Sequence, residues 1–348
     1  MSISAYFLSI MKDERRSADA VVFGLFLTIL SFFYCAAVGL ASWMYKTGIK
    51  RSYKMDVPVV SVGNITLGGT GKTPFVIYLA DYFSGKGVKA GILTRGYGGD
   101  ETVLMKETLP DTAVYAGKNR LDNARAAVND GCKLLILDDG FQHRRIKRDL
   151  DIVLLDKNKP FGNGHIFPRG VLRESTDALK RADICIFTKI DRKKCSGEAT
   201  SSVCTACRGE MPAGSTAVSG VHKPVFFTDA SNTFYPLESV RGKKVCLVAG
   251  IADPIYFEEM VYGLGCDIKK TFFFDDHYAY AQCDVDAIGE VCEKQGIEKI
   301  IMTHKDFVKF RKLDCLKIEN KILVLMVKFA VTEGKESLFA RLDSVIFC

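Results

Sequence analysis

Glycine, lysine and threonine residues near position 70 are spaced so that together they can hold a chain of phosphates. Residues 59–80 read VVSVGNITLGGTGKTPFVIYLA, which is an apolar run, a glycine-rich loop and an amphipathic segment, in that order. Backbone N–H groups of such a loop and of the following helix face phosphate oxygens, a lysine adds positive charge, and a threonine hydroxyl binds Mg²⁺. The pattern predicts a nucleotide site formed by Gly68, Gly69, Thr70, Gly71, Lys72 and Thr73.

This loop departs from the strict P-loop pattern G-x-x-x-x-G-K-[ST], because Thr66 stands where the first glycine belongs. We expect Gly63, Gly68 and Gly69 to supply the backbone freedom instead. The alternative is an ordinary strand–turn–helix with chance glycines. Pro74 suits the first turn of a helix and favours the nucleotide-binding interpretation.

A pair of carboxylates follows a second apolar run. Residues 133–137 read KLLIL, and Asp138 and Asp139 come next. P-loop proteins hold Mg²⁺ with a carboxylate at the end of a buried strand. Such a run is common on its own, but together with the loop upstream it predicts that Asp138 and Thr73 are the magnesium ligands.

The elements that must position these residues alternate along the first half of the chain. Apolar runs without polar alternation are typical of buried parallel strands, and amphipathic segments near 73–84 and 120–129 supply helices for both faces of the sheet. Ligands of such folds bind at the carboxyl ends of the strands. We therefore predict an α/β fold with a parallel sheet of the P-loop NTPase type. The expected strands are residues 57–62, 89–94, 112–117, 133–138, 151–156 and 182–189.

A second, smaller α/β set follows a stretch, residues 192–220, in which the pattern weakens. We expect the apolar run 321–331 and the helix after it to complete this second set. The predicted units are a membrane-associated helix (1–44), a P-loop core (45–220) and a smaller lobe (221–348) that closes over the nucleotide. Its other elements are strands at 243–251, 268–274 and 299–306 and helices at 254–264 and 283–295.

The N-terminal region contains a long uncharged segment. Residues 20–44 carry no charged side chain and, as a helix, would extend about 37 Å, enough to cross a bilayer core of about 30 Å. A signal peptide would not follow the charged stretch 12–16. Trp43 and Tyr45 suit a membrane interface. We expect membrane attachment, either as a true span or as a helix that lies in the interface or packs on the core.

Composition narrows the classes of partner. The chain has 348 residues, 48% hydrophobic and 26% charged, which is ordinary for a globular protein, and its net charge of +7 suits an anionic membrane or phosphorylated substrates. No basic stripe interleaved with aromatic residues occurs, so we expect no nucleic-acid partner. Nothing in the sequence indicates an obligate protein partner.

The twelve cysteines lack the regular spacing of a disulfide framework, and Cys185 and Cys246 lie in apolar runs, which favours a reducing compartment. Cys204 and Cys207, with Cys195 nearby, have the spacing of half a zinc site. No second pair follows, so we expect these cysteines to be structural.

Several stretches, in order, resemble the tetraacyldisaccharide 4'-kinase (lipid A 4'-kinase) family of Gram-negative envelope biogenesis. The resemblance implies an ATP- and Mg²⁺-dependent kinase that phosphorylates the 4'-hydroxyl of a tetraacyldisaccharide 1-phosphate. It also implies a location at the inner membrane, with the catalytic domain facing the cytoplasm. The matching stretches are VGNITLGGTGKTP (62–74), TRGYGG (94–99), GDE (99–101), DDGFQHRR (138–145), FGNGHIFPRGVLRE (161–174), AGIADPIYF (249–257), DDHYAY (275–280) and MTHKDFVKF (302–310).

The resemblance implies a catalytic pair. The family's GDE motif falls on Asp100 and Glu101, and its histidine falls on His277, which would orient the Asp100 carboxylate or share the proton it takes. The insert that the family usually has before GDE is absent, and Thr102 stands where proline is usual. Without the resemblance, Asp100 would be interpreted as a solvated turn residue and His277 as a structural one.

Further residues are implied at lower weight as substrate-binding or supporting groups. Arg169, where the family commonly has alanine, and Arg173 are available for an anionic sugar phosphate. His304 stands where the family often has glutamate, which argues against a catalytic role for it. The remaining candidates are Arg95, Glu101, Asp139, Gln142, His143, Arg144 and Glu174.

Two other classes of protein remain open on the residues alone. One is a membrane-associated P-loop GTPase or ATPase switch, because residues 188–191 (TKID) partly match the guanine-reading N-K-x-D motif, with Thr188 in place of asparagine. The other is a non-catalytic scaffold that retains a nucleotide-binding fold.

Overall fold

The computed structural model describes residues 3–11, 13, 15, 17–96, 99–189, 207, 210–211 and 214–346. In these residues one sheet of twelve strands extends through the molecule, in the order β10-β9-β11-β12-β7-β6-β5-β1-β4-β2-β3, with β8 paired to β7. The strands are β1 (Val59–Gly63), β2 (Ala90–Thr94), β3 (Ala113–Ala116), β4 (Leu134–Asp138), β5 (Leu150–Asp156), β6 (Ile184–Thr188), β7 (Thr216–Thr228), β8 (Phe234–Tyr235), β9 (Lys244–Ala249), β10 (Asp267–Phe273), β11 (Lys299–Thr303) and β12 (Ile322–Glu333).

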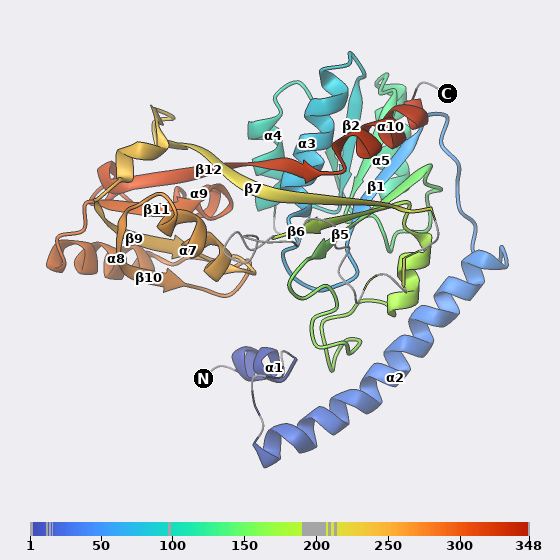
Figure 1. The fold of residues 1–348 in the computed structure, drawn as a ribbon, viewed down its shortest axis with the longest axis horizontal. Helices are drawn as coiled ribbons and strands as arrows, with labels where there is room; N and C mark the ends of the chain where they lie inside the picture. The colour runs from blue at the N-terminus through green and yellow to red at the C-terminus, as the bar shows by residue number, and fades with distance from the viewer. Residues whose placement is uncertain are drawn as a thin grey trace.

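Helices cover this sheet and extend from it at the N-terminal end (Figure 1). The α-helices are α1 (Ile3–Met11), α2 (Ala18–Lys46), α3 (Lys72–Ser84), α4 (Asp100–Thr108), α5 (Arg120–Asn129), α7 (Pro254–Tyr262), α8 (Gln282–Lys294), α9 (His304–Phe310) and α10 (Lys335–Ile346). Short 3₁₀ turns lie at η1 (Thr176–Arg181), η2 (Leu237–Val240) and η3 (Glu319–Lys321).

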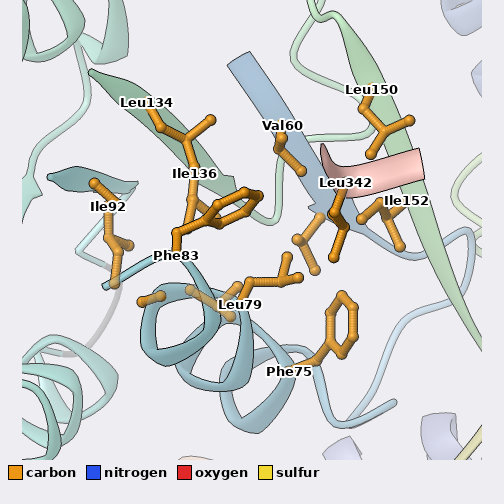
Figure 2. Packing of buried hydrophobic residues seen from close by; sticks show 14 of the residues in the cluster. Val60, Phe75, Leu79, Phe83, Ile92, Leu134, Ile136, Leu150, Ile152 and Leu342 are labelled. Atoms are coloured by element: carbon orange, nitrogen blue, oxygen red, sulfur yellow. The ribbon is translucent and has the colours of Figure 1, made fainter. Parts of the chain in front are cut away.

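The first group of strands, β1 to β6, is parallel throughout, as the sequence predicts. Strands β1, β2, β4 and β6 are buried throughout and β5 nearly so, which explains why they are continuously apolar, whereas the edge strand β3 is partly exposed. On one face, Phe75, Leu79 and Phe83 of α3 pack against Val60 and Ile136 (Figure 2). This contact fixes the first turn of α3 at the end of β1, where the glycine loop lies.

Two long strands join this group to the second one, which consists of β9, β10 and β11 with α7, α8 and α9 (Figure 1). β7 pairs antiparallel with β12, and their register shifts between Met326 and Val327, opposite Pro224. The pairings of β7 with β12 and with β8 are antiparallel, and the others in the described sheet are parallel. The predicted boundary between residues 220 and 221 falls within β7.

The C-terminal helix differs from our expectation that it completes the smaller unit. Leu338 and Leu342 of α10 are fully buried in the same cluster as Phe75 of α3. The hydroxyl of Tyr82 donates a hydrogen bond to Asp343 at 2.7 Å. The chain therefore returns along β12 to the P-loop group, and α10 packs there.

The helix α2 is 29 residues long and contains an 18-residue stretch with a mean hydropathy of 2.4, so by length and composition it is able to cross a membrane. It begins two residues before the predicted uncharged segment. Only one narrow stripe of it is buried: Ala20, Gly24, Leu27 and Ser31. Large apolar side chains, such as Phe32 at 73% exposure, cover much of the rest of its surface. The helix thus presents an apolar surface outward while one stripe contacts the protein.

Candidate active site

The conformation of the glycine loop between β1 and α3 depends on glycines with positive φ and on hydrogen bonds from buried polar side chains. Gly68 and Gly71 adopt left-handed backbone angles, with φ of 109° and 82°. The amide of Asn64 donates to the Thr70 hydroxyl at 3.2 Å, and the hydroxyl of Thr188 donates to the Thr70 carbonyl at 3.1 Å. These contacts pin the loop just before Lys72, at the N-terminus of α3.

Gly63 serves a different purpose from the one that the sequence indicated, and Gly71 is constrained by a neighbouring side chain. Gly63 does not loosen the loop, because it is the last residue of β1, and a Cβ there would lie 2.6 Å from Cβ of Phe141. Gly71 must be glycine because a Cβ there would lie 2.3 Å from the His222 ring. Burial lowers the pKa of His222 to about 4, so a neutral imidazole lies under the loop.

Asp138 lies at the carboxyl end of β4, as predicted, and is 3% exposed. Its Oδ2 accepts a hydrogen bond from the Thr94 hydroxyl at 3.2 Å, whereas its Oδ1 is buried without a hydrogen-bond partner. Burial, reinforced by the negative charge of Glu101, raises the pKa of Asp138 to about 6. An unsatisfied buried carboxylate oxygen beside a phosphate-binding loop fits a Mg²⁺ ligand, and Thr73 lines the same cleft.

The neighbouring Asp139 is surrounded by cations. Its carboxylate accepts hydrogen bonds from Arg173 at 2.8 and 3.0 Å and lies 3.5 Å from the ammonium of Lys72. Arg120 donates to its carbonyl at 3.0 Å. Burial would raise the pKa of Asp139, but Lys72 and Arg173 outweigh it and hold the pKa below its usual value. Asp139 therefore stays ionised and fixes the P-loop lysine.

Asp100 and His277 come together from different parts of the fold. Asp100 begins α4 and is 3% exposed, while His277 follows β10 and has a left-handed φ of 62°. Nδ1 of His277 lies 3.4 Å from Oδ2 of Asp100, and so does the ammonium of Lys309. Burial would raise the pKa of Asp100, but Lys305, Lys309 and His277 together lower it. The carboxylate is thus poised in its ionised form.

A single cleft of about 1040 Å³ collects most of the predicted residues. Lys72, Asp138 and His277 all line it, so the phosphate-binding end and His277 share one space. Asp100 does not line the cleft but lies against its wall, 3.4 Å from Nδ1 of His277. Two aromatic residues, Tyr256 and Phe226, line another part of its wall. The predicted site residues that line the cleft are Gly68, Gly69, Thr70, Gly71, Lys72, Thr73, Arg95, Glu101, Asp138, Asp139 and His277.

Four lower-weight candidates lie behind the cleft wall. Gln142 donates to the Asn64 carbonyl at 2.9 Å and so supports the loop. Burial lowers the pKa of His143 to about 4, so its ring is neutral. Glu174 is buried and accepts hydrogen bonds from Arg144 and Arg181, both at 3.0 Å, beside a second cavity of about 470 Å³ that α2 helps to line.

The two arginines expected to face an anionic sugar are engaged within the protein. Arg169 binds Asp13 at 2.6 Å and donates to the Ile10 carbonyl at 3.2 Å, which ties its loop to the end of α1. Arg173 is held by Asp139. His304 pairs with Glu107 of α4 at 3.1 Å.

Several site residues were missed by sequence reasoning. Lys305 and Lys309 of α9 surround Asp100, and the ammonium of Lys305 lies 3.6 Å from Glu101. Lys189 pairs with Asp253 at 2.7 Å at the cleft wall. The signal for the two lysines was their four-residue spacing after β11, which places both on one face of a helix. Residues 190–206 lie outside the described residues, and with them Cys195, Cys204 and the rest of the TKID motif.

A glycine loop between a parallel strand and a helix, with a buried carboxylate at the next strand end, defines a P-loop nucleotide-binding protein. The family model described as tetraacyldisaccharide-1-P 4'-kinase matches residues 23–99 and 98–346. The chain belongs to this family. The two matched segments meet at residues 98–99, where the sequence lacks the usual insert.

Relatives and a solved structure agree with this assignment. The tetraacyldisaccharide 4'-kinase of Syntrophus aciditrophicus is 36% identical, covering 94% of this chain and 95% of that protein. The enzyme of the same name from Desulfatibacillum aliphaticivorans is 35% identical, covering 88% and 89%. The crystal structure of LpxK from Aquifex aeolicus in complex with ATP superposes with a TM-score of 0.69 at 26% identity, covering 91% of this chain and 98% of that one.

Proposed function

We propose that this chain transfers the γ-phosphate of ATP to the 4'-hydroxyl of a tetraacyldisaccharide 1-phosphate, giving a bis-phosphorylated lipid A precursor. One observation carries the proposal. His277 lines the same cleft as Lys72 and Asp138, and the Asp100 carboxylate lies 3.4 Å from its ring. The carboxylate that would accept a proton from an incoming alcohol is thereby in contact with the wall of the cleft that binds phosphate, and phosphoryl transfer to an alcohol requires both functions.

In this scheme the donor phosphates bind the loop from Gly68 to Thr73, and Lys72 neutralises charge at the β- and γ-phosphates. Thr73 and Asp138 would hold Mg²⁺, which when bound neutralises charge on the phosphates. Asp139, itself held by Arg173, keeps the Lys72 ammonium in place beside the loop.

Asp100 takes the proton of the 4'-hydroxyl as that oxygen attacks phosphorus. Lys305 and Lys309 hold the carboxylate in its ionised form, and His277 orients it or shares the proton. Because Asp100 begins α4 and His277 follows β10, both groups of strands contribute to the reaction. We propose that residues 45–220 act as the kinase core and that residues 221–348 close over the nucleotide.

The acceptor is a lipid, and α2 offers the means of reaching it. An apolar helix whose outer surface is exposed suits insertion into the inner membrane, with the catalytic part on the cytoplasmic side, where ATP is available. The net charge of +7 favours an anionic surface. We propose no obligate protein partner and no nucleic-acid partner.

The alternatives, a nucleotide-driven switch and a non-catalytic scaffold, are separated by nucleotide turnover. Purified full-length protein is assayed with ATP or GTP, each with and without a tetraacyldisaccharide 1-phosphate in detergent micelles. A kinase consumes ATP rapidly only when acceptor is present. A switch hydrolyses nucleotide without acceptor, and a scaffold consumes no nucleotide with or without acceptor. Either result would overturn the proposal.

A further inference from the structure

We propose that Tyr34 of α2 is a positioning residue for phosphoryl transfer, because it holds Arg173 and, through Asp139, the P-loop Lys72. The helix that carries the membrane-facing surface would then also set the geometry of the phosphate-binding loop. The inference rests on the kinase function proposed above. It assigns to α2 a part in the reaction in addition to attachment.

The contacts begin where α2 meets the segment 166–173. Ser31 lies 2.8 Å from the Ile166 carbonyl and accepts a hydrogen bond from the Arg169 backbone at 3.0 Å. One turn further along α2, the Tyr34 ring packs edge-on against Phe167, with ring centroids 5.5 Å apart. The segment is thus held against one face of α2 by both polar and aromatic contacts.

Tyr34 then contacts the residue that matters for the cleft. Its hydroxyl donates a hydrogen bond to the Arg173 carbonyl at 3.2 Å. A phenol is protonated at neutral pH, so the hydroxyl is a donor in this contact. Tyr34 and Arg173 both line the cleft that contains the glycine loop. The hydrogen bond therefore fixes the backbone of Arg173 at the cleft wall.

From Arg173 the connection runs to the lysine. The guanidinium binds both carboxylate oxygens of Asp139, and Asp139 lies 3.5 Å from the Lys72 ammonium. Asp139 also has a left-handed φ of 49°, a conformation that a non-glycine residue keeps only when its surroundings hold it. A displaced Arg173 would release the carboxylate and allow Lys72 to leave its position. An error of about 1 Å at such a group is costly in rate.

The test compares Tyr34→Phe with Tyr45→Phe, a matched change on the same helix. Both full-length variants are assayed in detergent micelles, where attachment to a bilayer plays no part. We expect Tyr34→Phe to lower kcat about three- to tenfold, the effect of losing one hydrogen bond, with a melting temperature lowered by no more than a few degrees. Tyr45→Phe should keep the kcat of the unmodified protein. A Tyr34→Phe variant with unaltered kcat would overturn the inference.

A double variant distinguishes positioning from a general structural role. If Tyr34 acts through Asp139, adding Tyr34→Phe to Asp139→Asn should cause no further loss of kcat, measured with radiolabelled ATP so that low turnover is quantified. The same fold-loss in both backgrounds would mean that Tyr34 acts independently, and the inference would be wrong. If the unmodified protein transfers no phosphate in this assay, the proposed function fails instead.

Discussion

Two neighbouring aspartates at the end of β4 show how residue environment divides their roles. Asp138 is buried beside an acidic neighbour, Glu101, and its pKa is raised to about 6. Asp139 is held by Arg173 and Lys72, and its pKa is lowered. Asp138 has a carboxylate oxygen without a hydrogen-bond partner, which suits a metal ligand. Asp139 stays ionised and holds the ammonium of Lys72.

Lys72 is the cation on which phosphate binding depends most. Lys72→Ala should lower kcat/KM by roughly a hundredfold or more, since the transferred phosphate loses its main cationic partner. The fold should persist, because Asp139 retains Arg173. Circular dichroism checks the fold, and Lys294→Ala, on the exposed face of α8, serves as the control. Near-normal turnover in a folded Lys72→Ala protein would show that the glycine loop does not bind the phosphates.

The raised pKa of Asp138 should make the stability of the folded protein depend on pH. Its folded pKa of about 6 exceeds the ordinary value of about 3.9, so the stability it contributes is fully present below about pH 4 and is lost as pH rises through 6. The loss amounts to at most about 3 kcal/mol. Asp138→Asn, melted without Mg²⁺ or nucleotide, should therefore gain stability over the unmodified protein at pH 8 and little at pH 4.5. The exposed Asp177→Asn control should show no such gain, and an equal effect of Asp138→Asn at both pH values would exclude the buried charge as its cause.

At the scale of elements, the P-loop group was predictable because its strands are continuously apolar and its helices amphipathic. Strand β7 was missed because it contains Ser219, Gly220, His222 and Pro224, which resemble a loop in the sequence. Two of them have a tertiary reason: a Cβ at Gly220 would lie 2.1 Å from the ring of Phe329, and His222 lies under the glycine loop. Pairing with a strand about a hundred residues later decides this element, and local sequence does not record that pairing.

The same distinction applies to the site. Lys72, Thr73 and Asp138 belong to local motifs and could be found from spacing alone. The spacing of Lys305 and Lys309 places them on one face of a helix, but they reach Asp100 only because α9 packs against α4, and local sequence does not record that contact. The pairing of Asp100 with His277 came from family resemblance, and the structure brings the two side chains together.

The helix α2 predicts how the chain associates with membranes. Deleting residues 1–44 should release the catalytic part into the soluble fraction, since α2 is the one helix in the described residues long and apolar enough to cross a bilayer. Fractionation of cells expressing both forms measures this. Membranes from cells with the truncated protein are washed with high salt, which removes charge-based contacts. If the truncated protein still pellets with membranes, a second apolar attachment surface exists.

At the scale of the whole molecule, we propose that the reaction needs residues from both groups of strands. Asp100 stands on the P-loop side, and His277, Lys305 and Lys309 come from the group around β9 to β11. The paired strands β7 and β12 extend from one group to the other and connect them (Figure 1). Catalysis should therefore be sensitive to changes on either side and strongly non-additive between them.

Asp100→Ala and His277→Ala test this joint action. Each should lower kcat severely with a much smaller change in nucleotide affinity, and the double variant should be about as impaired as the worse single one. The limb of the pH–rate profile that reports the base should change in each single variant. Losses that multiply in the double variant would show that the two residues act separately, and Glu101 or Asp139 would become the next candidates for the base.

The structure of the lipid product tests the proposed function most directly. Purified full-length protein is incubated with ATP, Mg²⁺ and a tetraacyldisaccharide 1-phosphate in micelles, and the lipid is analysed for its mass and for the position of any new phosphate. We expect a bis-phosphorylated lipid whose new phosphate is on the 4'-oxygen. A folded protein that leaves the acceptor unchanged, or that places the phosphate elsewhere, would contradict the proposal.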